Sequence, residues 1–186
     1  MIYIKDEEFI RGNCPMTKEE VRIVSIAKLG IEKGYRALDI GAGTGSVAIQ
    51  MALISETQEV YAIEKDKEAL EVLYKNKEKF NAVNLNIIPG EAVDSEVSGE
   101  FDAVFVGGSG GNIEAIIDKY SRVLKPGKNM VLNFITIDNF YKASEKLKTL
   151  NYEIECLQLA ISKTKGKSYM LMANNPIFIL TAVKRV

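Results

Sequence analysis

The chain contains no histidine among its 186 residues. Histidine is the commonest general base in enzymes and belongs to the Ser-His-Asp and Cys-His catalytic sets. It is also the commonest side-chain ligand of protein-bound metals. The sequence therefore excludes those nucleophilic mechanisms and imidazole metal sites, and we expect no protein-bound metal. Its chemistry must rest on carboxylates, lysine, tyrosine, backbone dipoles or the reactivity of a bound cofactor.

Cysteine is scarce as well, with only Cys14 and Cys156, which lie far apart in the sequence. A small secreted protein held together by disulfides would usually carry more cysteines, so we expect a reducing, cytoplasmic location. The first eight residues include three acidic side chains and no apolar segment of the kind that a signal peptide needs.

Long apolar runs and an excess of positive charge are also missing. No run approaches the roughly 20 apolar residues that cross a membrane. The formal net charge of -1 gives no overall field that would attract nucleic acid or anionic lipid. We therefore expect neither a membrane nor a nucleic acid as partner.

Strand and helix patterns alternate along most of the chain. The first helix is expected at 17–29, with Thr17 as its N-cap and Glu20 completing a capping box. Further helices are expected at 45–55, 67–80, 113–124 and 139–150, and strands at 36–40, 60–64, 85–88, 103–106 and 129–134. Because right-handed crossovers put helices on both faces of a sheet, this alternation predicts a doubly wound parallel sheet.

The pattern changes near the C-terminus. Residues 152–162 and 177–183 have the character of strands, and a polar, lysine-rich loop without a helix joins them. They predict an antiparallel hairpin at the edge of the parallel sheet. We expect one domain over residues 1–186, of the α/β class, with a Rossmann-like sheet and a terminal antiparallel hairpin.

A glycine-rich loop follows the first predicted strand and opens a helix, with the sequence Asp39-Ile40-Gly41-Ala42-Gly43-Thr44-Gly45-Ser46. Glycines allow a tight turn and a close approach of ligand, and the helix N–H groups point toward that ligand. The dinucleotide fingerprint needs a glycine where this chain has Ser46, which disfavours an NAD-dependent oxidoreductase. A tight strand-to-helix turn without a ligand is the structural alternative.

Glu64 ends the second predicted strand, at the sheet edge where such folds bind ligands. A carboxylate there can accept two hydrogen bonds from a ribose diol. The loop, this acid and the closing hairpin resemble class I S-adenosylmethionine-dependent methyltransferases. The resemblance implies that Asp39 orders the loop and that the donor contacts Gly41, Ala42, Gly43, Thr44, Gly45 and Glu64, with Glu91 and Ala92 on its adenine side.

A second glycine-rich run, residues 107–111, follows the fourth predicted strand, where methyltransferases of this fold place the acceptor. The Asn/Asp-Pro-Pro-aromatic motif of enzymes that methylate base nitrogens is absent. Cys14-Pro15 has the reverse order of the Pro-Cys nucleophile of cytosine carbon-5 enzymes. Four glycines and one serine leave room for a flat, bulky acceptor, and their amides could bind an anion. A flexible loop is the alternative.

The chain as a whole resembles the decarboxylating precorrin carbon-15 methyltransferases of cobalamin biosynthesis. The matching segments are 10–12, 15–22, 39–46, 61–64, 104–111, Asn133 and Asn175-Pro176. The resemblance implies S-adenosylmethionine as methyl donor and a (cobalt-)precorrin tetrapyrrole as acceptor. It also implies contact of Thr17 with the donor, a homotetramer, and carbon-5 methylation by a separate protein.

On the acceptor side we expect Gly107, Gly108, Ser109, Gly110, Gly111 and Asn133, with Arg11 paired to a macrocycle carboxylate. A surface position for Arg11 and a strand-end polar group satisfied within the protein for Asn133 are the structural alternatives. No residue is assigned as a general base. Lys163, Lys165 and Lys167 could also meet substrate carboxylates, and a solvated hairpin tip is the equal alternative. A methyltransferase for RNA or another small molecule, and a non-catalytic subunit that binds the donor, are the competing functions.

Overall fold

The computed structural model describes residues 3–54 and 58–185. Its helices are η1 (Asp6–Glu8), α1 (Glu19–Leu29), α2 (Ser46–Leu53), α3 (Lys67–Lys79), α4 (Ile113–Ser121) and α5 (Ile137–Thr149). Its strands are β1 (Arg36–Ile40), β2 (Glu59–Glu64), β3 (Leu85–Pro89), β4 (Phe101–Val106), β5 (Leu124–Phe134), β6 (Tyr152–Leu159), β7 (Ser162–Lys165), β8 (Met170–Ala173) and β9 (Ile177–Lys184). None of the helices in these ranges is long and apolar enough to cross a membrane.

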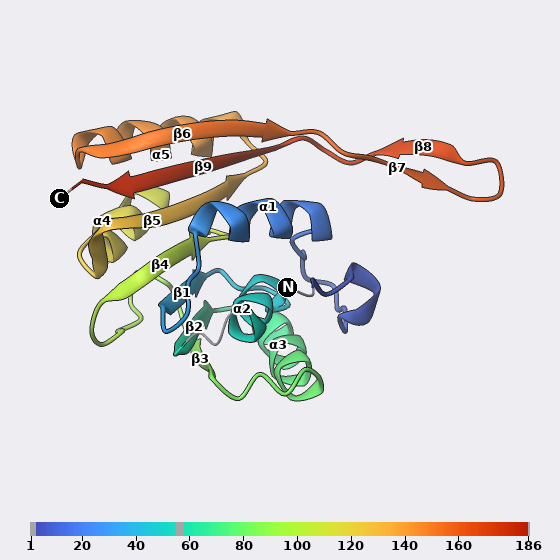
Figure 1. Cartoon of the computed structure of the whole chain (residues 1–186), viewed down its shortest axis with the longest axis horizontal. Coiled ribbons are helices and arrows are strands. Elements are labelled where there is room, and N and C mark those ends of the chain that lie inside the picture. The colour runs from blue at the N-terminus through green and yellow to red at the C-terminus, as the bar shows by residue number, and fades with distance from the viewer. Residues whose placement is uncertain (1–2, 55–57, 186) are drawn as a thin grey trace.

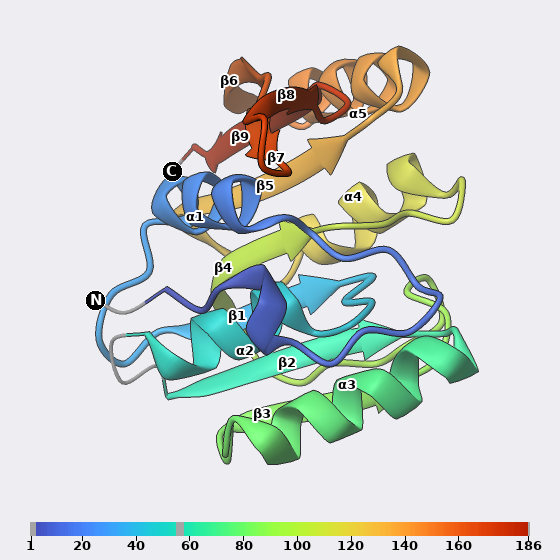
Figure 2. The same ribbon diagram turned by 90° about the vertical axis from the view of Figure 1, so that its right-hand side faces the viewer.

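Seven strands form one sheet in the order β3-β2-β1-β4-β5-β9-β6, which Figure 2 shows from its lower edge to its upper edge. The first five run parallel to their neighbours, whereas β9 is antiparallel to both β5 and β6. The order reverses between β1 and β4, so the carboxyl ends of these two strands flank the topological switch point. The predicted fold class, including the terminal antiparallel hairpin, is confirmed.

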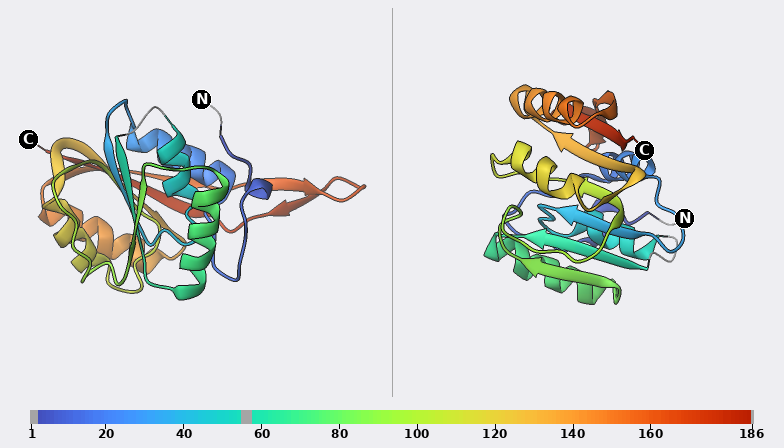
Figure 3. Two further views of the ribbon diagram at one scale, coloured as in Figure 1. Left: turned by 90° about the horizontal axis from the view of Figure 1, so that it is seen from below. Right: turned by 90° about the vertical axis from the view of Figure 1, so that its left-hand side faces the viewer.

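Helices cover the sheet on both faces (Figure 3). Alternate residues of one strand point to opposite faces, and in β1 Ala37 joins a core cluster with residues of α1, α2 and α3. Leu38 and Ile40 join the opposite cluster, which includes residues of α4 and α5. Because both faces of the central strands are buried, those strands are almost wholly apolar.

Several predicted boundaries are wrong. Helix α1 begins at Glu19 and has Lys18 as its N-cap, without a side-chain capping bond, so Thr17 forms no capping box. The Thr17 carbonyl instead accepts a hydrogen bond from Arg22 Nη1 at 2.8 Å. Helix α4 ends at Ser121 rather than at 124, and 125–127 belong to β5. The β4–β5 pairing is irregular there, with a register shift between Phe101 and Ala103.

The segment expected as a polar loop folds into a second hairpin. Strands β7 and β8 pair antiparallel and form a separate two-stranded sheet. This β7–β8 arm projects away from the body of the protein (Figure 1). Its distal part exposes four large side chains, at 46% to 76% of their surface: Tyr169, Met170, Leu171 and Met172.

Candidate functional site

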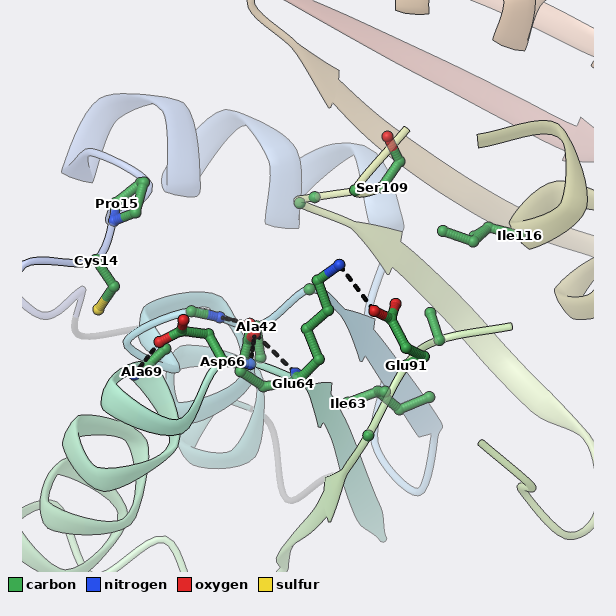
Figure 4. A pocket seen from close by; sticks show the side chains of 18 of the residues that line it. Cys14, Pro15, Ala42, Ile63, Glu64, Asp66, Ala69, Glu91, Ser109 and Ile116 are labelled. Atoms are coloured by element: carbon green, nitrogen blue, oxygen red, sulfur yellow. Dashed lines mark hydrogen bonds and ion pairs between the residues drawn. The ribbon is translucent and has the colours of Figure 1, made fainter. Parts of the chain in front are cut away.

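A pocket of about 430 Å³ lies at the carboxyl ends of β1, β2, β3 and β4. The loop after each of these strands supplies part of its wall, and the rest comes from the segment before α1, the end of β2, the start of α3 and Ile116 of α4 (Figure 4). The wall comprises Asn13, Cys14, Pro15, Thr17, Gly41, Ala42, Gly43, Ile63, Glu64, Lys65, Asp66, Glu68, Ala69, Gly90, Glu91, Ala92, Val93, Gly107, Gly108, Ser109, Gly110, Asn112 and Ile116.

The two glycine-rich segments touch each other through their backbones at this pocket. Gly41 has a φ of +71°, which favours glycine, and a Cβ built on it would lie 2.6 Å from the carbonyl oxygen of Gly108. The carbonyl of Ile40 accepts hydrogen bonds from the Gly107 and Gly108 N–H groups at 2.9 and 3.4 Å. Any side chain at position 41 would therefore separate the loop after β1 from the run after β4.

Glu64 joins three parts of the pocket floor. Its side chain is buried, and its Oε2 accepts a hydrogen bond from the Gly43 N–H at 2.7 Å. Its Oε1 accepts hydrogen bonds from the Lys65 and Asp66 N–H groups, each at 2.8 Å. A carboxylate has about four lone-pair sites, so Glu64 can hold the glycine loop and still accept from a bound diol.

The far end of the pocket is more apolar and suits a flat ring. Ile63, Ala92, Val93 and Ile116 contribute to this part of the wall. Beside it, Glu91 accepts a hydrogen bond from Lys65 Nζ at 2.9 Å, drawn as a dashed line to Glu91 in Figure 4.

Asp39 lies behind the glycine loop and outside the pocket wall. Its side chain is buried, and neither carboxylate oxygen has a hydrogen-bond partner of normal geometry within the described residues. Burial raises the pKa of Asp39 to about 8; the Ala48 N–H counteracts this rise in part, and the charge of Glu64 adds to it. The carboxyl group is therefore mostly protonated at neutral pH.

Arg22 fastens the segment before α1 over the pocket. Its side chain is fully buried, with its guanidinium 4.9 Å from the centre of the Phe9 ring. It donates to the carbonyls of Ile4 and Thr17 and forms an ion pair with Asp6 at 3.2 Å. Buried charges of this kind need several partners, and here those partners hold residues 4–17 against the body.

The structure brings most of the predicted site residues together. Of the predicted donor side, the pocket wall contains Thr17, Gly41, Ala42, Gly43, Glu64, Glu91 and Ala92. Of the predicted acceptor side, it contains Gly107, Gly108, Ser109 and Gly110.

Other predicted residues lie outside the wall. Thr44 is buried, Gly45 packs against Leu73, and Gly111 leaves open space around its Cα. Asn133 Nδ2 donates to Ser25 Oγ at 2.9 Å, which ties β5 to α1. Arg11 is 48% exposed and lies 3.8 Å from Asp6.

Sequence reasoning assigned no role in the site to several wall residues. Lys65 and Asp66 directly follow Glu64, so their proximity to it was available as a signal. Cys14 and Ile116 reach the wall only through tertiary folding, and nothing local marks them.

The pocket fits a small cation that carries a flat apolar end. Its wall has the carboxylates of Glu64, Asp66, Glu68 and Glu91 against the single ammonium of Lys65, counted over the residues that the structure describes. Glycine N–H groups and Glu64 are available to a polar, hydroxylated middle part. This combination suits the sulfonium, ribose and adenine of S-adenosylmethionine. In the described ranges, no group of three or more His, Cys, Asp or Glu side chains could hold a metal ion.

Comparisons with known proteins agree with this geometry. The model of the precorrin methyltransferase domain matches residues 8–184. A cobalt-precorrin-6B C(15)-methyltransferase (decarboxylating) from Salmonella typhimurium is 40% identical over 185 residues, 97% of this chain and 96% of that protein.

Solved structures give the same result. A precorrin-6y C5,15-methyltransferase from Geobacter metallireducens superposes with a TM-score of 0.94 at 36% identity, over 98% of this chain and 96% of that one. A precorrin 8w decarboxylase from Methanobacterium thermoautotrophicum superposes with a TM-score of 0.90 at 27% identity, over 96% of this chain and 98% of that one. The chain therefore belongs to the precorrin methyltransferase family and is an S-adenosylmethionine-dependent methyltransferase.

Proposed function

We propose that this protein methylates carbon-15 of a cobalt-precorrin and removes the ring-C acetate carboxyl group as carbon dioxide, in cobalamin biosynthesis. The observation that carries the proposal is the match of nearly the whole chain to a relative of that named activity. The backbone contact between the donor loop and the glycine run supports it independently, because it suits the transfer of a methyl group to a bulky acceptor.

The donor side of the pocket consists of Thr17, Gly41, Ala42, Gly43, Glu64, Glu91 and Ala92. S-adenosylmethionine supplies an electrophilic methyl group when it is bound. Glu64 accepts hydrogen bonds from the ribose, and the carboxylates around it favour the positive charge of the donor. Asp39, Thr44 and Gly45 support this side from behind by shaping the loop and its junction with α2 and α3.

The acceptor side consists of Gly107, Gly108, Ser109 and Gly110. The small side chains of this run let the macrocycle edge come close to the donor loop, and such placement is the main contribution to the rate. The new carbon–carbon bond forms as the carbon–sulfur bond breaks. The macrocycle supplies the electron pair of this new bond, and the pair left behind when carbon dioxide departs restores it through the conjugated system. No net proton is gained or lost, so the chain needs no histidine.

We also propose a cytoplasmic homotetramer that works beside a separate carbon-5 methyltransferase. Cys14 and Cys156 are both free thiols, which suits a reducing compartment. The apolar tip of the β7–β8 arm suits contact with another copy, because exposed apolar patches mark interaction surfaces. The Salmonella relative is named for carbon-15 alone, which supports carbon-5 methylation by a separate protein.

The activity is tested by following S-adenosylhomocysteine release under anaerobic conditions with cobalt-precorrin-6B, with total RNA and with no acceptor. We expect release with cobalt-precorrin-6B, and none with total RNA or without an acceptor. Gly108→Val should abolish this release and leave donor affinity at the wild-type value, because valine would fill the acceptor side. Release with RNA and none with the precorrin would contradict the proposal.

A further inference from the structure

Lys65 holds a position between the two halves of the pocket. It follows Glu64 at the end of β2, and its Nζ donates a hydrogen bond to Glu91 Oε1, beyond β3. On its other side, a Cβ built on Gly110 would lie 2.9 Å from the same Nζ. The ammonium group therefore lies directly against the glycine run on the acceptor side.

The charge around Lys65 makes this position significant. Counted over the described residues, Lys65 is the one cation in a pocket wall with four carboxylates. Such a wall suits the cationic donor but repels an acceptor that carries many carboxylates. Two other cations that could meet substrate carboxylates lie outside the wall and already have acidic partners, since Arg11 pairs with Asp6 and Lys163 with Glu20.

The partner of Lys65 is easily exchanged. The Lys65 and Glu91 side chains are each 47% exposed, and exposed ion pairs of this kind contribute little to stability. The hydrogen bond that Lys65 donates to Glu91 raises the pKa of Lys65, so the ammonium keeps its charge over the whole neutral range. A ligand carboxylate that arrives along the glycine run meets the same donor as Glu91 does.

We propose that Lys65 binds a carboxylate of the acceptor, releasing Glu91, and so fixes how the macrocycle is turned relative to the donor. The inference rests on the proposed function, which supplies a polycarboxylate acceptor. The bound carboxylate is one that the product keeps, because an ion pair to the departing carboxylate would stabilise it against loss of carbon dioxide. Lys65 is thus a positioning and specificity residue.

The test compares Lys65→Met and Lys65→Arg with Lys75→Met, a matched control at an exposed position of α3. Three quantities are measured: the KM and kcat for the cobalt-precorrin, the Kd of S-adenosylmethionine by calorimetry, and the Kd of uroporphyrin by fluorescence. Uroporphyrin is a stable tetrapyrrole with a carboxylate on every peripheral side chain.

For Lys65→Met we expect the precorrin KM and the uroporphyrin Kd to rise by about tenfold or more, the loss of one charge-assisted hydrogen bond. The kcat should fall as well, because a macrocycle that is no longer held in one orientation presents its reacting carbon to the donor less often. The donor Kd should stay within about twofold. Lys65→Arg should retain most of the affinity for the precorrin and for uroporphyrin, and Lys75→Met should retain all of it.

Wild-type values of both acceptor constants in Lys65→Met would overturn the inference. A higher Kd of S-adenosylmethionine in Lys65→Met with an unchanged Kd of uroporphyrin would also overturn it, because Lys65 would then contact the donor rather than the acceptor. Lys65-dependent uroporphyrin binding without wild-type turnover of the precorrin would contradict the proposed function and leave this inference standing. A wild-type protein that neither turns over the precorrin nor binds uroporphyrin would contradict both.

Discussion

Gly41 and Gly108 meet backbone to backbone, with the carbonyl oxygen of Gly108 only 2.6 Å from where a Cβ on Gly41 would lie. Gly41 follows β1 and Gly108 follows β4, and these two strands are neighbours in the sheet. The donor loop and the acceptor run are therefore parts of one rigid unit rather than two independent loops. This contact brings the ends of the two binding sides together.

Gly41→Ala should disturb both sides of the pocket. The new Cβ meets backbone atoms that cannot turn away, and the positive φ adds strain of about 1 kcal/mol. We expect a lower melting temperature and a donor affinity reduced by tenfold or more, on the order of 1.4 kcal/mol. Gly108→Ala is the matched control, since its Cβ would lie 3.9 Å from the nearest atoms of Gly41. Equal effects of the two variants in thermal unfolding and calorimetry would contradict the contact.

Glu64→Ala should weaken donor binding while the protein still folds. The substitution removes the acceptor of three backbone N–H groups and of the ribose hydroxyls. Hydrogen bonds to a charged group contribute about 1.5 to 3 kcal/mol each, so calorimetry should register at least a tenfold loss of affinity. The donor affinity of Glu64→Gln, which keeps one acceptor oxygen, should lie between those of the wild type and Glu64→Ala. Unchanged donor affinity in Glu64→Ala would remove Glu64 from the ribose role.

Asp39 should make the folded state less stable as the pH rises. Burial raises its pKa from 3.8 to about 8, so between these pH values the folded protein holds a proton that the unfolded chain has released. Folding then takes up a proton, and the free energy of unfolding declines across this range. Asp39→Asn removes that proton uptake. The free energy of unfolding of Asp39→Asn, measured with urea from about pH 5 to about pH 8, should therefore fall less than that of wild type. If the two free energies fall equally with pH, Asp39 is not buried in its protonated form.

Leu171→Glu should disrupt the assembly and spare the pocket. Leu171 is 68% exposed on the β7–β8 arm, far along the chain from the donor loop. A charge there opposes any apolar contact between copies. Sedimentation should show a smaller species than the tetramer proposed for the wild type, with wild-type donor affinity. Val83→Glu, at a position 79% exposed beyond α3, is the control that should keep the wild-type mass. A wild-type monomer would contradict the proposed tetramer.

The parts that could be predicted from the sequence are those with a local signal. The loop at 41–45 follows one clearly apolar strand, and Glu64 ends the next. Their place at the carboxyl edge of the sheet was therefore predictable. Thr17 was misassigned as a helix cap because Thr and Glu in that spacing favour a capping box, whereas the buried Arg22 binds the Thr17 carbonyl. Lys65 was passed over because its role depends on Glu91 and Gly110, which only the folded chain brings beside it.

The reaction itself is tested most directly by anaerobic mass spectrometry of cobalt-precorrin-6B incubated with the protein and methyl-labelled S-adenosylmethionine. The proposed function predicts a product that has gained one labelled methyl group, at carbon-15 by nuclear magnetic resonance, and has lost one carbon dioxide. A macrocycle that returns unchanged from a protein that still binds the donor would contradict the assignment of substrate and reaction. A labelled methyl without loss of carbon dioxide would contradict the decarboxylation.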